Sequence, residues 1–176
     1  MAASEDLWVF GYGSLIWRPG FPHDERRIAT IYGYHRALCV YSHVHRGTPE
    51  KPGLVLGLDG GGSCKGVAFR VPAAATSATI AYLRDREQVT HVYREVFLRA
   101  RLEDRRLVPA LCYVVDRGHD QYAGRLDRHE LERLVAQGQG LSGANPDYVR
   151  NTQEHLEDLG IRDETLEWLS RRLTAS

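Results

Sequence analysis

The order of two hydrophobic periodicities constrains the fold of this chain more than any other feature. Through the first two thirds, apolar residues follow strand-like patterns, which a single helical pattern at residues 73–87 interrupts. From residue 127 onward the pattern is helical. Strands followed by helices, with one helix inserted among the strands, indicate an α+β fold. The number of strands suits a small barrel or a strongly curled sheet around a pocket, and periodicity alone does not separate these two.

Six segments are expected to form strands. Residues 91–102 show the clearest alternation between two faces. The glycine-rich stretch Asp59–Ser63 lies between two shorter apolar segments and predicts a β-hairpin there. The expected strands are residues 7–10, 28–42, 54–58, 65–71, 91–102 and 107–115.

The first expected helix covers residues 73–87, because its apolar residues recur at spacings of three and four. The stripe consists of Ala73, Thr76, Ile80 and Leu83, and it should face the core. Three later helices are expected to begin at residues that cap or open helices. These start signals are Asp127, Asn145–Pro146 and Asp163.

Length and charge narrow the class of protein. The 176 residues fit one domain, residues 1–176, with no linker or repeat. Lys and Arg number 23 and Asp and Glu number 23, so no electrostatic attraction to nucleic acid or an anionic membrane is expected. The N-terminal residues show neither the basic region nor the apolar region that a signal peptide has. No apolar run reaches the roughly 18 residues that a membrane-spanning helix needs. We therefore expect a cytoplasmic protein that binds a small polar molecule.

The cysteines and histidines predict no metal site. Cys39, Cys64 and Cys112 are widely spaced and form no CxxC pair, which argues against a disulfide framework and against zinc. Buried, reduced thiols are expected. His43 and His45 form an HxH pair with no third ligand in register, so they are expected to be ordinary histidines.

Glu87 is a candidate for proton transfer. It lies four residues after Leu83, on the apolar stripe, whereas Asp85 lies about 200° away around the helix and should face solvent. A carboxylate in a poorly solvated pocket has a raised pKa and can take and return a proton near neutral pH. Alternatively, Glu87 pairs with Arg84 or Arg86, or it is solvated because the helix ends early. The periodicity leaves these alternatives open.

A glycine-bearing loop follows the first expected strand. Its glycines allow the backbone to approach a ligand, and successive amides can point at a carboxylate or a developing oxyanion. An ordinary tight turn is the alternative. The pattern Gly11-x-Gly13 lacks the third glycine of a dinucleotide-binding fingerprint. The candidate substrate-binding segment is Val9, Phe10, Gly11, Tyr12, Gly13, Ser14 and Leu15.

Three further residues are possible substrate contacts. Arg46 and Lys51 lie in a turn-rich loop, where they meet substrate carboxylates or simply face water. Tyr148, just inside the helix opened by Asn145–Pro146, either lends its hydroxyl to a pocket or packs with the hydroxyl in water.

These residues, in this order, resemble the ChaC-like γ-glutamylcyclotransferases over nearly the whole chain. Any one piece of the match is common, but the ordered set is specific. The matching segments are Trp8–Trp17, His45–Gly47, Lys51–Gly53, Gly66–Arg70, Tyr82–Leu83, Arg86–Glu87, Ser142–Gly143, Asn145 and Tyr148.

The resemblance implies an enzyme that converts glutathione to 5-oxoproline and cysteinylglycine without metal, nucleotide or redox cofactor. The family's catalytic glutamate falls on Glu87, and its substrate-binding loop falls on Val9–Leu15. Gln88 follows the catalytic acid, at a position that varies in the family. The implied fold is a small mixed β-barrel with helices packed around it, and no obligate protein partner is implied.

Two alternatives remain at this point. One is a related cyclotransferase that acts on another γ-glutamyl amino acid or amine. The other is a non-catalytic binding or regulatory relative that keeps the pocket without the activity.

Overall fold

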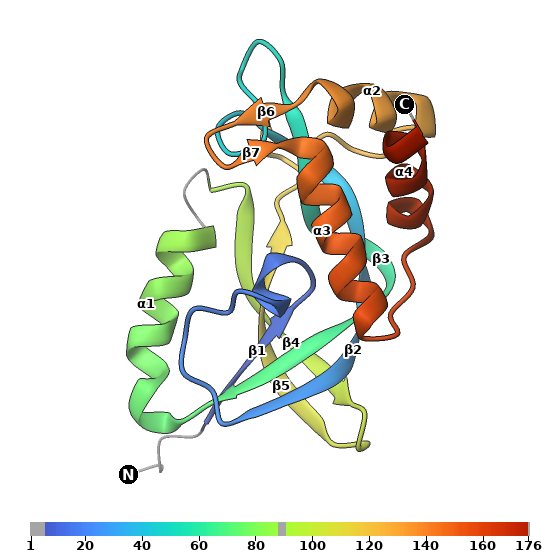
Figure 1. Cartoon of the computed structure of the whole chain (residues 1–176). Coiled ribbons are helices and arrows are strands. Elements are labelled where there is room, and N and C mark those ends of the chain that lie inside the picture. Colours follow the sequence, from blue (N-terminus) through green and yellow to red (C-terminus); the bar gives the residue numbers. More distant parts are fainter. Residues whose placement is uncertain (1–5, 88–90, 176) are drawn as a thin grey trace. The chain divides into compact units, whose positions relative to one another are not determined.

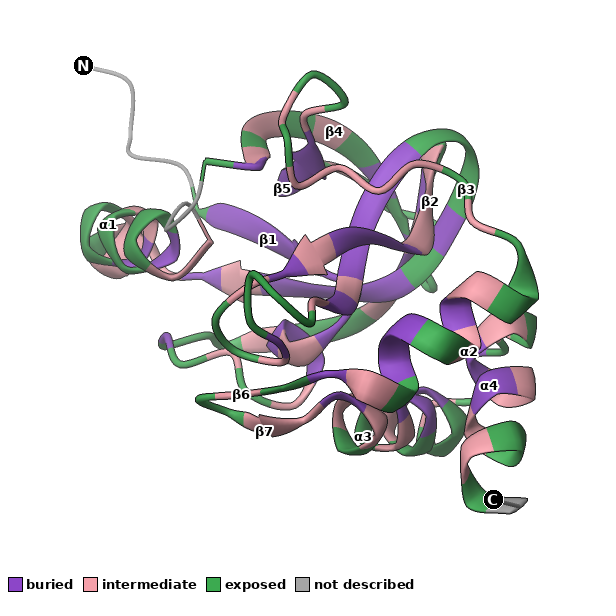
Figure 2. Ribbon diagram, turned by 90° about the horizontal axis from the view of Figure 1, so that it is seen from above, coloured by how far each residue is buried: buried purple, intermediate pink, exposed green. Residues whose placement is uncertain are grey.

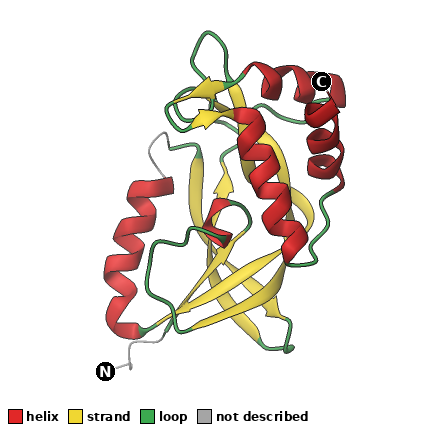
Figure 3. Cartoon of the chain, viewed as in Figure 1, coloured by secondary structure: helices red, strands yellow, loops and turns green. Residues whose placement is uncertain are grey.

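The computed structural model describes residues 6–87 and 91–175, which form seven strands, two short 3-10 helices and four α-helices (Figures 1 and 3). In chain order these are β1 (Leu7–Gly11), η1 (Ser14–Ile16), β2 (Glu25–Ser42), β3 (Gly53–Val71), η2 (Ala73–Ala75), α1 (Thr76–Glu87), β4 (Tyr93–Leu102), β5 (Leu107–Val115), α2 (Arg128–Gln137), β6 (Gln139–Gly140), β7 (Gly143–Ala144), α3 (Asn145–Asp158) and α4 (Glu164–Ala175).

Five strands close into a barrel in the order β1-β3-β2-β4-β5. The barrel is mixed, because β1 runs antiparallel to β3, with Val9 opposite Phe69, and parallel to β5, with Val9 opposite Leu111. The α+β prediction is therefore confirmed. Of the two arrangements that periodicity left open, the closed barrel is the one found.

The chain groups into two compact units. Unit 1 contains the residues up to Arg36 together with Leu58–Asp116, and unit 2 contains Ala37–Gly57 together with the residues from Arg117 onward. Strands β2 and β3 contribute residues to both units. The expectation of one domain over residues 1–176 stays a prediction.

The barrel interior of unit 1 explains why its strands are so apolar. All five residues of β1 are buried (Figure 2). Gly66 of β3 allows β3 to approach the end of β1, since a Cβ at that position would lie 2.3 Å from the Gly11 carbonyl oxygen. The largest fully buried side chains here include Phe10, Ile31, Phe69, Leu102, Leu111 and Tyr113.

The prediction of a hairpin around Asp59–Ser63 was wrong, because Gly53–Val71 is one continuous strand. Glycines that resemble a turn in sequence instead lie within this strand, where Gly61 and Gly62 have φ values of +103° and +71°. Residues 60–63 of the strand are exposed. Glycine, which has no Cβ, adopts such positive φ values without steric cost, so the strand changes direction without ending.

The positions of the other elements of unit 1 agree with the sequence. The strand predicted at residues 107–115 has these bounds, and the one predicted at 91–102 begins two residues later, at Tyr93. Helix α1 and the 3-10 turn before it cover the predicted helix at residues 73–87. Of the stripe predicted to face the core, only Leu83 is fully buried, whereas Ala73, Thr76 and Ile80 are half-buried. The other buried residue of α1 is Thr79, which lies off the predicted stripe.

Unit 2 contains the three later helices, each of which buries one apolar face. Asp127 caps α2 by accepting a hydrogen bond from the Glu130 amide at 2.9 Å, and Asp163 accepts one from the Leu166 amide at 3.0 Å where α4 begins. Pro146 lies in the first turn of α3. The start signals read from the sequence are confirmed. Buried residues of these helices are Leu131, Leu134, Val135, Val149, Leu156, Leu166 and Leu169.

The three cysteines are buried and free, as predicted. Burial raises the pKa of the Cys112 thiol to about 12, so the thiolate needed for a nucleophile is suppressed. Among residues 6–87 and 91–175, no helix combines the length and apolar character needed to span a membrane.

Candidate active site

The loop that follows β1 is built into unit 1. Val9, Phe10, Gly11, Tyr12 and Gly13 are buried, and the chain then tightens into η1, where the Ile16 amide donates to the Gly13 carbonyl at 2.9 Å. The carbonyl of Tyr12 accepts a hydrogen bond from Arg36 Nε at 2.6 Å, and Nη2 of the same arginine donates to the Lys65 carbonyl at 2.6 Å. The Tyr12 carbonyl is thus bonded to β2, and the Gly13 carbonyl is bonded within the 3-10 turn.

Two amides of this loop are available to a ligand. Within the described part of the chain, the N–H groups of Gly13 and Ser14 donate no hydrogen bond. Gly13 is buried and Ser14 is half-buried. Buried backbone N–H groups are almost always paired, so the unused Gly13 amide, with the Ser14 amide next to it, indicates a place where a ligand supplies the acceptor. This arrangement is chemically suited to an oxyanion or a carboxylate.

Glu87 ends α1, and its side chain keeps 17% of its exposure. Burial raises the pKa of its carboxyl group above the ordinary value, and the neighbouring Arg86 acts in the opposite direction with the smaller effect. Asp85 is exposed, as its position on the helix predicts. Of the two acids at the end of α1, only Glu87 therefore has the desolvated environment of a proton-transfer group.

The arginines near Glu87 play different parts. Arg84 pairs with Glu95 of β4 through two hydrogen bonds, at 3.1 and 3.0 Å. Arg86 Nε lies 3.7 Å from Glu87 Oε1, which is a long ion pair. Glu87 is therefore both desolvated and loosely paired with Arg86, so these two alternatives are not exclusive.

Arg86 links the loop to the carboxylate. Its Nη2 donates to Ser14 Oγ at 2.9 Å, while its Nε faces Glu87. One guanidinium therefore lies between the substrate-binding segment and the proton-transfer candidate. The sequence predicts Arg86 as a possible partner of Glu87 and as a motif residue, but it does not reveal the bond of Arg86 to the loop. The pairing of Arg86 with Ser14 spans 72 positions, so no local pattern reports it.

Tyr113 of β5 is a further group beside Glu87. It is buried, and its hydroxyl donates to Glu95 Oε2 at 2.8 Å. Burial, the hydrogen bond to Glu95 and the charges of Glu95 and Glu87 raise the pKa of Tyr113 well above its ordinary value. Tyr113 therefore stays a neutral donor on this side of the site.

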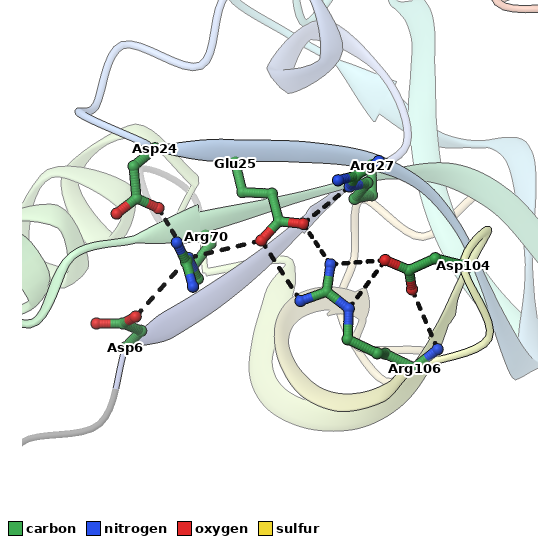
Figure 4. Close-up of polar contacts among 7 residues, drawn as sticks. All are labelled: Asp6, Asp24, Glu25, Arg27, Arg70, Asp104 and Arg106. Atoms are coloured by element: carbon green, nitrogen blue, oxygen red, sulfur yellow. Dashed lines mark hydrogen bonds and ion pairs between the residues drawn. The ribbon is translucent and has the colours of Figure 1, made fainter.

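A second cluster of acids in unit 1 shows the opposite environment (Figure 4). Glu25 accepts hydrogen bonds from Arg27, at 2.8 Å, and from Arg106, and Arg70 lies 3.7 Å from it. The hydrogen bonds from Arg106 and Arg27 lower the pKa of Glu25 to about 2. Glu25 is therefore a member of an ion-pair network that stays charged near neutral pH, and it is unsuited to proton transfer there.

Arg46 and Tyr148 lie together in unit 2. The Arg46 guanidinium lies 5.5 Å from the centre of the Tyr148 ring, and its Nη1 donates to the Ala144 carbonyl at 3.1 Å. The Tyr148 hydroxyl accepts a hydrogen bond from the Leu56 amide at 3.0 Å. Both side chains are thus held by contacts within unit 2. Lys51 is exposed, and its amide donates to Thr48 Oγ1 at 3.1 Å.

Asn145, which begins α3, is fully buried and bonded to β3. Its side chain accepts from the Leu54 amide and donates to the Leu54 carbonyl, both at 2.8 Å. Neighbouring glycines allow the backbone to pack closely here, because a Cβ on Gly53 or Gly138 would lie 2.3 or 2.4 Å from the Arg46 carbonyl oxygen. The segments at Arg46, Gly53–Leu54, Gly138 and Asn145 thus pack closely against one another, and we call this place the Asn145 crossing.

The histidines of the HxH pair have other partners. His45 Nδ1 lies 2.9 Å from Ser142 Oγ, and the His43 ring stacks on Tyr41 at 6.4 Å between centroids. Within residues 6–87 and 91–175, no three His, Cys, Asp or Glu side chains are grouped so as to hold a metal ion. Gln88 lies outside the described residues.

The fold defines a class with solved members. A crystal structure of a glutathione-specific γ-glutamyl cyclotransferase from yeast superposes with a TM-score of 0.87 at 22% identity, over 97% of this chain and 96% of that one. A structure described as a γ-glutamyl cyclotransferase gives a TM-score of 0.58 at 12% identity, over 94% and 86% of the two chains. The barrel with its helices is thus the γ-glutamylcyclotransferase fold.

The family model described as ChaC-like protein matches residues 7–175, and the chain belongs to this family. Named relatives agree. A glutathione-specific γ-glutamylcyclotransferase of Escherichia coli (strain K12) is 34% identical over 160 residues, which cover 91% of this chain and 69% of the relative. Glutathione-specific γ-glutamylcyclotransferase 1 of Homo sapiens is 32% identical over 158 residues, covering 88% and 71%. The resemblance expected from the sequence motifs is confirmed.

Proposed function

We propose that this chain is a γ-glutamylcyclotransferase that converts glutathione to 5-oxoproline and cysteinylglycine. The observation that carries the proposal is the desolvated Glu87 carboxyl, with its raised pKa, held through Arg86 to a loop with two unused amides. The activity named for relatives at 34% and 32% identity supports the same reaction.

The reaction needs few catalytic groups. The α-amine of the γ-glutamyl group attacks its own γ-carbonyl carbon, so the C–N bond of the five-membered ring forms within one molecule. The bond from that carbon to the cysteinyl nitrogen then breaks, and the nitrogen takes up a proton as cysteinylglycine leaves. No enzyme nucleophile is required, which agrees with buried thiols throughout.

Glu87 performs both proton transfers in this proposal. At neutral pH the α-amine is mostly protonated, so Glu87 in its charged form first removes a proton from it. The protonated Glu87 then gives the proton to the departing cysteinyl nitrogen. The second proton that the α-nitrogen loses when it becomes the lactam nitrogen is balanced by protonation of the released amine of cysteinylglycine. A raised pKa favours the second step without preventing the first, since both forms are accessible when the pKa lies nearer to the working pH.

The loop Val9–Leu15 binds the γ-glutamyl portion. When the amine attacks, the γ-carbonyl oxygen becomes an oxyanion, and the unused amides of Gly13 and Ser14 are the donors assigned to it. Removal of one such donor typically costs about 3 kcal/mol in transition-state stabilisation. Arg46 and Tyr148 are proposed as further substrate contacts, and a cytoplasmic location remains the prediction from the sequence.

The test is product identity. Purified protein is incubated with glutathione, and 5-oxoproline and cysteinylglycine are measured by mass spectrometry. Equimolar release of both supports the proposal, and Glu87→Gln prepared in parallel excludes a contaminating enzyme. Faster release of 5-oxoproline from γ-glutamyl-alanine than from glutathione would indicate a cyclotransferase with a different substrate. Binding of glutathione without 5-oxoproline would indicate a non-catalytic relative.

A further inference from the structure

Arg86 makes more contacts across unit 1 than a helix-end arginine needs. Its Nη1 donates to the Arg18 carbonyl, to the Pro19 carbonyl at 3.4 Å and to the Tyr82 hydroxyl at 3.0 Å. Its Nη2 donates to Ser14 Oγ, and its Nε faces Glu87. A single guanidinium therefore bonds the segment from Ser14 to Pro19 and lies beside the proton-transfer carboxylate.

Two further features show that the segment is docked on α1. Tyr82 lies one helical turn before Arg86, so both side chains project from the same face of the helix. The chain turns against Tyr82 at Gly20, whose φ is +74° and where a Cβ would come within 2.1 Å of the Tyr82 hydroxyl. The segment after β1 is drawn alongside α1 in Figure 1. Tyr82 and Arg86 together thus form the surface that this segment contacts.

We propose that Arg86 is a positioning residue for the reaction: it fixes Ser14 and the backbone at residues 18–19 against the helix that bears Glu87, and so sets the distance between substrate loop and carboxylate. The inference rests on the proposed function. The Ser14 hydroxyl accepts from Arg86, so this hydrogen bond fixes the position of the Ser14 side chain relative to α1.

Arginine is required for this by its shape. The planar guanidinium offers five donors in a fixed fork. In Arg86 these donors face the Glu87 carboxylate, the Ser14 hydroxyl and the carbonyls of Arg18 and Pro19. A lysine keeps the charge beside Glu87 but supplies one compact ammonium, which cannot span these partners. Arg86→Lys therefore separates positioning from charge, and Arg86→Met removes both.

The positive charge of Arg86 has a separate effect on the pKa of Glu87. Among residues 6–87 and 91–175, the titratable groups beside Glu87 are Arg86 on α1 and Tyr113 on β5. Tyr113 is bonded to Glu95, and Glu95 forms an ion pair with Arg84. Because Arg86 alone among them lowers the pKa of Glu87, its removal raises that pKa further. The acidic limb of the kcat profile is thus expected to move to higher pH in Arg86→Met and to stay in place in Arg86→Lys.

The experiment measures kcat, KM and pH profile for 5-oxoproline release in wild type, Arg86→Lys, Arg86→Met, Ser14→Ala and the Ser14→Ala/Arg86→Lys double variant. Arg84→Lys is the matched control on the same helix. Arg86→Lys is expected to lower kcat about 10- to 100-fold, as a misplacement on the order of 1 Å does, with KM and the thermal midpoint little changed. Ser14→Ala should cost much less in the Arg86→Lys background than in wild type.

Two results would overturn the inference: turnover of Arg86→Lys within twofold of wild type, or independent, multiplicative effects of Ser14→Ala and Arg86→Lys. If the Arg86 variants do not fold, Ser14→Ala alone decides, since it must lower kcat about tenfold at unchanged KM. An inactive wild type contradicts the proposed function, whereas an active wild type with an active Arg86→Lys contradicts only the positioning role.

Discussion

The motif residues of unit 1 and those of unit 2 differ in how far the fold already satisfies them. Around Asn145 in unit 2, both polar atoms of the side chain are bonded to Leu54, and the Tyr148 hydroxyl is bonded to Leu56. Around Glu87 in unit 1, the carboxyl is desolvated, its ion pair is long, and two loop amides are unused. Satisfied groups stabilise a structure, whereas unsatisfied ones remain available to a substrate.

The largest expected effect concerns Glu87. Glu87→Gln keeps the shape of the side chain but cannot move a proton, so kcat should fall about 10²- to 10⁴-fold. Asp85→Asn, two residues away and exposed, should keep wild-type turnover. Steady-state kinetics on glutathione measure both, and near-normal turnover of Glu87→Gln would remove the chemical role assigned to unit 1.

The next effect concerns stability in unit 2. Asn145→Ala leaves the buried amide and carbonyl of Leu54 without partners, which should lower the free energy of unfolding by about 3 kcal/mol. Asn151→Ala is the control, because Asn151 is exposed on the same helix. Urea denaturation compares the two. Equal stability of both variants would show that the Asn145 crossing is not a structural support.

Glu87 should also affect stability, in the opposite direction. The pKa of Glu87 in the folded state is raised above 4.5, so ionisation of Glu87 lowers the free energy of unfolding. This loss of stability begins as the pH rises above 4.5 and reaches its full size above the folded-state pKa. Glu87→Gln should therefore be more stable than wild type at pH 8 and no more stable at pH 4. Thermal midpoints at both pH values test this, with about 2–4 °C expected for each kcal/mol.

The smallest effect is expected at Tyr148. Tyr148→Phe removes the acceptor of the Leu56 amide and should cost about 1 kcal/mol of stability, whereas Tyr32→Phe, at a 60% exposed position, should cost almost none. If Tyr148 also contacts substrate, KM for glutathione rises severalfold as well. An unchanged KM would leave Tyr148 with a structural role alone.

Local patterns in the sequence predicted most of the fold. The helix start signals at Asp127, Asn145–Pro146 and Asp163, and the strand at residues 107–115, depend on near neighbours and were confirmed. The hairpin was wrong because a glycine run permits both a turn and a bend within a strand. Barrel closure depends on the pairing of β1 with β5, which lie about a hundred residues apart and share no pattern.

The site was predictable only where it depends on near neighbours in the sequence. Periodicity oriented Glu87 inward, and the family resemblance gave it a chemical role, which stays a prediction. The contacts of Arg86 with Ser14 and of Asn145 with Leu54 join distant segments, so no spacing rule reveals them.

The central claim is that Glu87 is a proton-transfer carboxyl because the fold desolvates it. A carbon-13 NMR titration of glutamate side-chain carboxyls, with Glu87 and Glu25 assigned by subtraction of the Glu87→Gln and Glu25→Gln spectra, measures both environments at once. The account predicts a pKa above 4.5 for Glu87 and about 2 for Glu25. A Glu87 carboxyl that titrates at or below 4.5 would contradict it.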